Sequence, residues 1–115
     1  MNKIEKISII HSVSRKYQSA LETCLKAAKN ENVIVSCVAS INSKNILKDI
    51  SNENSDLILV IGGDGTMISA IESFLTLEIP FLGINIGKLG FLTDIDVESI
   101  ISELPIILKG DYVSE

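Results

Sequence analysis

The sequence has few aromatic residues, few cysteines and a single histidine. Aromatic side chains make up 4% of the 115 residues, and Trp is absent. The core must therefore be built from Ile, Leu and Val, a composition that suits buried parallel strands. Cys24 and Cys37 form neither a CxxC pair nor a metal-ligand spacing. We expect both to be buried free thiols, which favours a reducing compartment, the cytoplasm.

The sequence also lacks the features of a membrane protein or a nucleic-acid binder. No stretch approaches the ~18 consecutive apolar residues of a membrane-spanning helix. The N-terminus has no apolar run of the kind found in signal peptides, and no basic amphipathic stretch is present. The formal net charge of −5 argues against a general nucleic-acid partner. We therefore expect neither a membrane nor a nucleic acid as partner.

Positive charge is missing from the middle of the chain. No Lys or Arg occurs from Asp49 through Gly87, and Lys88 is the first cation after this gap. An anion bound in this part of the protein must rely on backbone N–H groups, on a metal ion, or on cations from elsewhere.

What the sequence does contain is an alternation of apolar strand and helix patterns, with hydrophobic residues making up 46% of the chain. The length fits one domain. Strands are predicted at Ile7–His11, Val33–Val38, Asp56–Ile61 and Pro80–Ile84. Helices are predicted at Ser14–Asn30, near 43–50, at Thr66–Leu75, and from about Asp94–Val97, where Asp96 is the expected N-cap and Pro105 the expected end or kink.

This alternation predicts an α/β fold, a three-layer Rossmann-like parallel sheet with helices on both faces. Ligands bind such sheets outside the carboxyl ends of the strands. The loops at that edge are expected to begin at His11, Val38, Gly62 and Asn85. Two of these four loops carry glycine clusters, so sheet geometry and loop chemistry indicate the same site.

The first cluster, Gly62-Gly63-Asp64-Gly65-Thr66, joins a strand to a helix. Glycines let the backbone turn sharply and approach a ligand closely. The helix start supplies unpaired N–H groups and the positive end of the helix dipole. Asp64 is the one acid in the turn, and beside bound phosphates it would accept a proton from a hydroxyl or help to hold a metal ion.

Neither glycine cluster matches the two commonest nucleotide motifs. The first lacks the third glycine of a dinucleotide fingerprint, because Ile68 stands there. The second, Gly83–Gly90, has the spacing GxxxGxxG, and Leu89 stands where a P-loop requires Ser or Thr.

Taken together, however, Gly62–Met67 and the segment Pro80–Asp94 resemble NAD kinases. The GGDGT element is shared with diacylglycerol and sphingolipid kinases, and phosphofructokinases carry a relative of it. The second element, GINxGxLGFLTD, is far more specific to NAD kinases. The resemblance covers essentially the whole chain, including Gly110-Asp111-Tyr112 near its end.

The resemblance implies transfer of the γ-phosphoryl group of ATP, or of polyphosphate, to the 2′-hydroxyl of the adenosine ribose of NAD, giving NADP. Asp64 would accept the proton of that hydroxyl, Gly65 would contact NAD through its backbone, and Phe91 would lie against the adenine. Mg²⁺ or another divalent ion would accompany the donor, with no metal site predicted on the protein itself. The other nucleotide-binding candidates are Gly62, Gly63, Thr66, Asn85 and Lys88.

Members of the family continue into a second, β-rich domain with an Asn-Glu pair and a Gly-Ser-Thr-Ala-Tyr segment that complete the NAD site. The latter segment does not occur here. We therefore expect these residues to form the first domain of a longer, homo-oligomeric enzyme, and to have little kinase activity alone. Two alternatives stay open: a diacylglycerol-type lipid kinase domain and a non-catalytic nucleotide-binding module.

Other polar residues near the same edge have two interpretations each. His11 ends the first strand and either has a structural role or contacts a nucleotide. Arg15 and Lys16 form either a solvated helix end or a phosphate contact. Asp94 and Asp96 either cap a helix or hold a metal.

Overall fold

The structure is a computed structural model that describes residues 3–13, 17–44, 48, 50, 54–85, 95–96 and 100–109. Strands and helices alternate along the chain, as the apolar pattern predicts. The elements are β1 (Lys6–His11), α1 (Gln18–Asn30), β2 (Ile34–Ser40), β3 (Leu57–Gly62), α3 (Asp64–Phe74), η2 (Leu75–Leu77), β4 (Phe81–Asn85), β5 (Ile95–Asp96) and α4 (Ile100–Leu108).

The strands form one parallel sheet in the order β2-β1-β3-β4-β5. The chain first moves outward from β1 to β2, then returns past β1 to β3 and continues to β4. The direction of winding therefore reverses between β1 and β3. In open parallel sheets the crevice at the carboxyl ends of two such strands is the usual ligand site.

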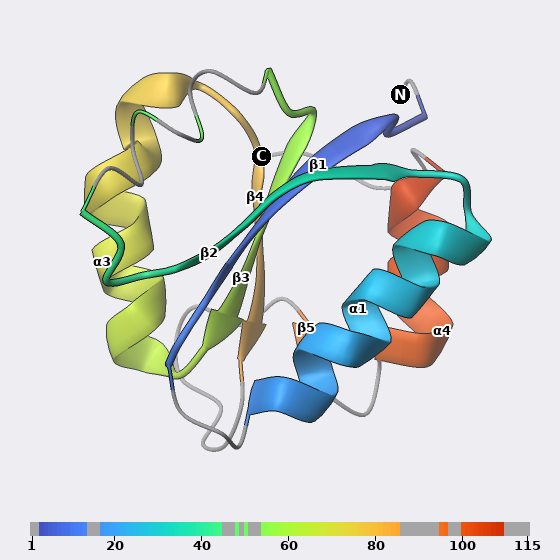
Figure 1. Cartoon of the computed structure of the whole chain (residues 1–115), viewed down its shortest axis with the longest axis horizontal. Helices are drawn as coiled ribbons and strands as arrows, with labels where there is room; N and C mark the ends of the chain where they lie inside the picture. The colour runs from blue at the N-terminus through green and yellow to red at the C-terminus, as the bar shows by residue number, and fades with distance from the viewer. Residues whose placement is uncertain are drawn as a thin grey trace.

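Helices cover both faces of the sheet, which confirms the three-layer prediction. Helices α1 and α4 lie on one face, and α3 lies on the other (Figure 1). Each face has its own apolar cluster, because β1 and β3 direct alternate side chains to opposite faces. The α1 and α4 cluster includes Ile7, Ile9, Cys24, Leu59, Ile61 and Leu104, and the α3 cluster includes Ile10, Ile50, Ile58, Val60, Met67 and Phe74.

The central strand β3 is buried along its whole length. Its sequence, LILVIG, is a continuous apolar run rather than an alternating one, as expected for a parallel strand with helices on both faces. Complete burial fixes the position of its last residue, Gly62, and so fixes where the following loop starts.

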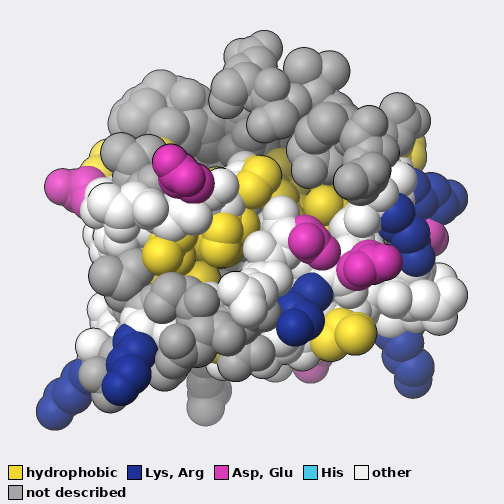
Figure 2. All heavy atoms as spheres, turned by 90° about the horizontal axis from the view of Figure 1, so that it is seen from above, with side chains coloured by type: hydrophobic (Ala, Val, Ile, Leu, Met, Phe, Trp, Pro, Cys, Tyr) yellow, Lys and Arg dark blue, Asp and Glu magenta, His cyan; other side chains and the backbone are white. Residues whose placement is uncertain are grey.

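The amino ends of β1 and β3 are joined at the opposite edge of the sheet. The Asp56 carboxylate accepts hydrogen bonds from the backbone N–H groups of Glu5 and Lys6, each at 3.0 Å, and the Asp56 N–H donates to the Lys6 carbonyl at 2.8 Å. The buried hydroxyls of Ser8 and Ser55 also hydrogen-bond to each other. Figure 2 looks onto this end of the molecule, where side chains of both charge signs lie among apolar ones.

Several predicted boundaries are wrong at the ends of elements. Helix α3 begins at Asp64 rather than Thr66, because the Met67 N–H already donates to the Gly63 carbonyl at 3.1 Å. Asp96 is not a helix cap, since it pairs with Asn85 in the short strand β5. Pro105 does not end the last helix, which continues to Leu108.

The prediction that both cysteines are buried is correct for one of them. Cys24 is fully buried, as predicted, but Cys37 is only half-buried, because β2 is an edge strand. Neither thiol is in a disulfide. Among the described residues, no helix is both long and apolar enough to cross a membrane.

Candidate functional site at the carboxyl edge of the sheet

A single residue, Gly63, links the end of β3 to the start of α3. The connection between β3 and α3 is therefore one residue long, shorter than the predicted segment Gly62–Thr66. Asp64, Gly65 and Thr66 form the first turn of the helix instead. The hydrogen bond from the Met67 N–H to the Gly63 carbonyl is the first of the helical ladder. Helix geometry leaves the three preceding N–H groups without an intrahelical acceptor, next to the positive end of the helix dipole.

The surroundings of the three glycines differ, so the reason for glycine differs from one position to the next. Gly62 is buried, and a Cβ added to it would lie 2.7 Å from the Thr66 Cβ and 2.8 Å from both outer atoms of that side chain. Glycine at this position lets the first turn of α3 pack directly on the end of β3. Gly62 therefore has a packing role that requires no ligand.

Gly65 is the opposite case. It is exposed, its backbone is helical, and a Cβ added to it would have no atom within 4 Å. Packing gives no reason for glycine here, and glycine costs a helix about 1 kcal/mol relative to alanine. An open space beside helix-start N–H groups is what close approach of a ligand to the backbone requires. At Gly63 the Tyr17 hydroxyl would lie 3.5 Å from an added Cβ, an ordinary contact distance.

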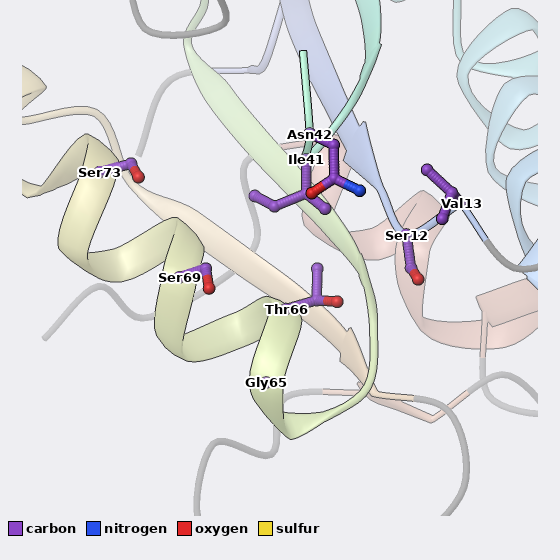
Figure 3. A pocket seen from close by; sticks show the side chains of 8 residues that line it. All are labelled: Ser12, Val13, Ile41, Asn42, Gly65, Thr66, Ser69 and Ser73. Carbon is purple, nitrogen blue, oxygen red and sulfur yellow. The ribbon is translucent and has the colours of Figure 1, made fainter. Parts of the chain in front are cut away.

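An open cleft of about 470 Å³ lies beside Gly65. One wall is the outer face of α3, and the other is formed by the segments that follow β1 and β2 (Figure 3). Backbone hydrogen bonds hold this second wall in place, from the Ser12 N–H to the Ile61 carbonyl at 2.9 Å and from the Ile41 N–H to the His11 carbonyl at 2.8 Å. The cleft therefore lies at the carboxyl ends of β1 and β3, where the winding of the sheet reverses.

In the part of the chain that the structure describes, the lining of the cleft is mostly polar and carries no charged side chain. It consists of Ser12, Val13, Ile41, Asn42, Gly65, Thr66, Ser69 and Ser73. The sequence predicted only Gly65 and Thr66 among these. A recognisable signal existed on α3, because Thr66, Ser69 and Ser73 recur at helical spacing on a face separate from that of the buried Met67 and Phe74. Ser12 and Asn42 carried no such signal, since they reach the cleft only through the sheet topology.

For the remaining predicted residues the structure describes the backbone alone or nothing. Lys88, Phe91 and Asp94 lie outside the described residues, as do Arg15 and Lys16. The backbones of Asp64 and Asn85 are described, at the start of α3 and at the end of β4.

His11 ends β1, as predicted, and is half-buried. Its Nδ1 lies 2.9 Å from the carbonyl oxygen of Ser12, a contact that fits a structural role at the end of the strand. Because a carbonyl oxygen can only accept a hydrogen bond, this contact requires a proton on Nδ1.

The described residues offer little for metal or thiol chemistry. They include no group of three or more His, Cys, Asp or Glu that would hold a metal ion. Burial raises the pKa of the Cys24 thiol to about 12. This thiol lies in the α1 and α4 cluster and stays protonated, so it is a core residue rather than a nucleophile.

Comparison with known proteins agrees with this geometry. Residues 3–112 match the family model described as the ATP-NAD kinase N-terminal domain. The chain is 47% identical to the NAD kinase of Methanothermobacter thermautotrophicus over 68 residues, which are 59% of this chain and 24% of that protein. It is 33% identical to the NAD kinase of Syntrophobacter fumaroxidans over 114 residues, or 95% of this chain and 40% of that protein.

A third relative, the NAD kinase of Saccharophagus degradans, is 43% identical over 81 residues, which are 67% of this chain and 28% of that protein. The chain thus spans less than half the length of each of these relatives. The matches favour the NAD kinase hypothesis over that of a lipid kinase with which only the GGDGT element is shared. Because the family model covers residues 3–112, including both glycine segments, the chain belongs to the ATP-NAD kinase family, as its N-terminal domain.

Proposed function

We propose that this chain is the nucleotide-binding part of an enzyme that phosphorylates the 2′-hydroxyl of the adenosine ribose of NAD to give NADP. The γ-phosphoryl group of ATP, or a phosphoryl group of polyphosphate, is the group transferred. The observation that carries this proposal is the open space at Gly65, at the N-terminus of α3 and beside the cleft where the sheet reverses its winding. Phosphate groups at that point are favoured by the helix N–H groups and by the helix dipole.

In this proposal Asp64 is the general base. It is the one acid of the strand–helix junction, and its backbone is fixed by the buried end of β3 and the first turn of α3. A carboxylate within reach of the ribose hydroxyl takes its proton as the phosphoryl group arrives. Such help is worth about 10²–10⁴ in rate. Positioning of the substrates and neutralisation of phosphate charge supply the rest.

The other proposed contacts come from the first turn of α3, from the end of β4 and from the residues that follow β4 in the sequence. Gly65 contacts NAD through its backbone, Phe91 lies against the adenine, and Asn85 and Lys88 contribute further contacts. Gly63 and Thr66 complete the phosphate-binding junction. Gly62 supports it by packing rather than by touching the nucleotide.

In this proposal Mg²⁺ arrives with the phosphoryl donor, bound to its phosphates. Magnesium is commonly bound through one or two carboxylates together with substrate phosphates. Here Asp64 would be the one carboxylate, and the ion would neutralise charge on the phosphates.

We further propose that the complete enzyme has a second, β-rich domain, assembles as a homo-oligomer and works in the cytoplasm. Neither Cys24 nor Cys37 is in a disulfide, which fits a reducing compartment.

The test is NADP formation by the intact protein, expressed from its complete reading frame. NAD is supplied with Mg²⁺ and either ATP or polyphosphate, and NADP is measured by a coupled NADP-specific dehydrogenase. We expect NADP to form with at least one donor, and far more slowly with the 115-residue chain alone. Phosphorylation of diacylglycerol in place of NAD would instead support a lipid kinase. Nucleotide binding without turnover would support a binding module.

A further inference from the structure

We propose that Tyr17 is a positioning residue for the phosphoryl transfer, because its hydroxyl holds Gly63 and so fixes where Asp64 lies. This inference rests on the proposed function, in which Asp64 is the general base. Three observations support it: the shortness of the connection between β3 and α3, the place of the Tyr17 hydroxyl beside that connection, and the burial of the Tyr17 ring.

The position of Asp64 depends on a single linking residue. Strand β3 ends at Gly62 and α3 begins at Asp64, so a change in the backbone angles of Gly63 would turn α3 relative to the sheet. Glycine restricts these angles less than any other residue. A general base must lie within about 2.6–3.2 Å of the atom whose proton it accepts. A contact that holds Gly63 therefore matters for the chemistry as well as for the fold.

Tyr17 reaches this connection from another part of the chain. Its hydroxyl oxygen lies 3.5 Å from the point that a Cβ of Gly63 would occupy. Among the described residues, apart from the two chain neighbours of Gly63, no other atom lies within 4 Å of that point. Tyr17 stands at the start of α1, which lies at the same end of the sheet as the start of α3 (Figure 1). The hydroxyl thus closes the side of Gly63 from which a side chain would project.

The core holds the Tyr17 ring in place. Tyr17 is buried and belongs to the α1 and α4 cluster, which also contains Ile9 of β1 and Ile61 of β3. A tyrosine side chain has only two torsion angles that place its ring, so a packed ring carries its hydroxyl to a defined point. Through Tyr17, the Gly63 connection is therefore supported by the same core that supports the two central strands.

Neither helix capping nor apolar packing explains why this residue carries a hydroxyl. Tyr17 is the N-cap residue of α1, where Ser, Thr, Asp or Asn is preferred, and its side chain makes no capping hydrogen bond. Phenylalanine would fill the same apolar space without the cost of removing a hydroxyl from water. Tyrosine suits a site with an apolar body and a polar tip, and the tip here lies at Gly63.

Two substitutions in the intact protein separate the role of the hydroxyl from that of the ring. Tyr17→Phe removes only the hydroxyl, and Tyr17→Leu also removes the ring. Ser8→Ala is the matched control, because it likewise removes one buried hydroxyl, from the hydrogen bond between Ser8 and Ser55 at the opposite edge of the sheet. Thermal unfolding checks that each variant is folded. The kinetics of NADP formation are then measured well below the lowest unfolding temperature, with the better of the two donors.

We expect Tyr17→Phe to lower kcat by roughly fivefold or more and to change the KM values for NAD and for the donor less than twofold, because both substrates still bind while the base is less well placed. Tyr17→Leu should lower kcat further. Ser8→Ala should keep kcat within a factor of two of wild type, even if its unfolding temperature falls.

Three kinetic results would overturn the proposal. The first is a normal kcat in Tyr17→Phe. The second is a raised KM with unchanged kcat, because the hydroxyl would then bind a substrate instead of holding the connection. The third is an equal loss of kcat in Ser8→Ala, because the rate would then follow stability in general.

Hydrogen exchange distinguishes the failure of this inference from the failure of the proposed function. The Met67 N–H donates to the Gly63 carbonyl at 3.1 Å, so its exchange rate reports opening of the connection. Mass spectrometry at single-amide resolution should show this amide exchanging roughly fivefold faster or more in Tyr17→Phe, and at the wild-type rate in Ser8→Ala. If neither donor gives NADP, the proposed function fails, and the exchange of Met67 still decides. Faster exchange in Tyr17→Phe alone supports the positioning role, and equal rates in all three proteins overturn it.

Discussion

The side chain of Thr66 lies directly against the backbone of Gly62, so that a Cβ at residue 62 would come within 2.7 Å of the Thr66 Cβ. The clash cannot be relieved by rotating the Thr66 side chain, because its own Cβ is the nearest atom. Gly62→Ala should therefore force α3 away from β3 and lower the free energy of unfolding by about 1–3 kcal/mol, the usual cost of overpacking. Urea denaturation followed by circular dichroism measures this change. A variant as stable as wild type would contradict the packing role.

Gly65→Ala is the matched substitution three residues further on, and the opposite result is expected for stability. No atom lies within 4 Å of an added Cβ, and alanine favours the helix by up to about 1 kcal/mol. The free energy of unfolding should be unchanged or higher. Nucleotide affinity should nevertheless fall, because the methyl group occupies the space through which a phosphate reaches the helix N–H groups. Calorimetric titration of the intact protein with ATP and with NAD checks this, and a stable variant with normal affinity for both would remove Gly65 from the site.

The Asp56 carboxylate should contribute to stability without affecting the site. It accepts backbone hydrogen bonds from Glu5 and Lys6 at the amino ends of β1 and β3, at the edge opposite the cleft. Asp56→Ala removes both hydrogen bonds and should lower the free energy of unfolding by about 1–2 kcal/mol. Its KM values for both substrates should stay near wild type, measured well below the unfolding temperature. A change in KM without a change in stability would contradict this assignment.

The Cys24 thiol makes stability depend on alkaline pH. Burial raises its pKa in the folded protein from an ordinary value of 9.0 to about 12. Above pH 9 the unfolded chain loses this proton while the folded protein keeps it, so the unfolded state is favoured as the pH rises. The free energy of unfolding should fall by at most about 1.4 kcal/mol per pH unit between pH 9 and 12. Urea denaturation at several pH values measures the slope, and Cys24→Ala should reduce it.

The same burial predicts a difference in reactivity between the two thiols. Alkylation of the folded protein at pH 8 should modify the half-buried Cys37 first and reach Cys24 only on unfolding. Peptide mapping by mass spectrometry distinguishes the two positions. Equal rates in the folded protein would show that Cys24 is more accessible than its burial indicates.

The layers of the fold were predictable from the sequence because they depend on apolar periodicity alone. The run LILVIG predicts a strand buried on both faces, and β3 is that strand. Where a helix or strand ends depends on competition between the local preference of a residue and its tertiary contacts. Asp96 has the side chain of a helix cap, yet its backbone pairs with Asn85, so sheet extension outweighed the local preference. Pro105 breaks helices in isolation, but here it lies within α4, whose Leu104 and Leu108 are buried in the core.

The candidate site was predictable only in part, for a physical reason. The Gly62–Thr66 segment is contiguous, so its spacing is visible in the sequence. The cleft beside it is assembled from three separate segments, after β1, after β2 and along α3. Ser12 and Asn42 meet α3 only because the sheet order places β1 and β2 beside β3. Small polar residues of this kind are common on any surface, and nothing in their local sequence marks them.

Asp64→Asn is the most direct test of the proposed chemistry. The substitution keeps the size and shape of the side chain but removes its charge and its ability to accept a proton. In the intact protein, kcat for NADP formation should fall by about 10²–10⁴, the usual contribution of a general base, while the KM for NAD changes much less. Asp56→Asn provides the matched control, because it makes the same chemical change at the opposite edge of the sheet and should leave kcat within a factor of two of wild type. If Asp64→Asn also kept near-normal turnover, the proton would have to be taken by another group, and Asp64 would be at most a residue that positions the substrates.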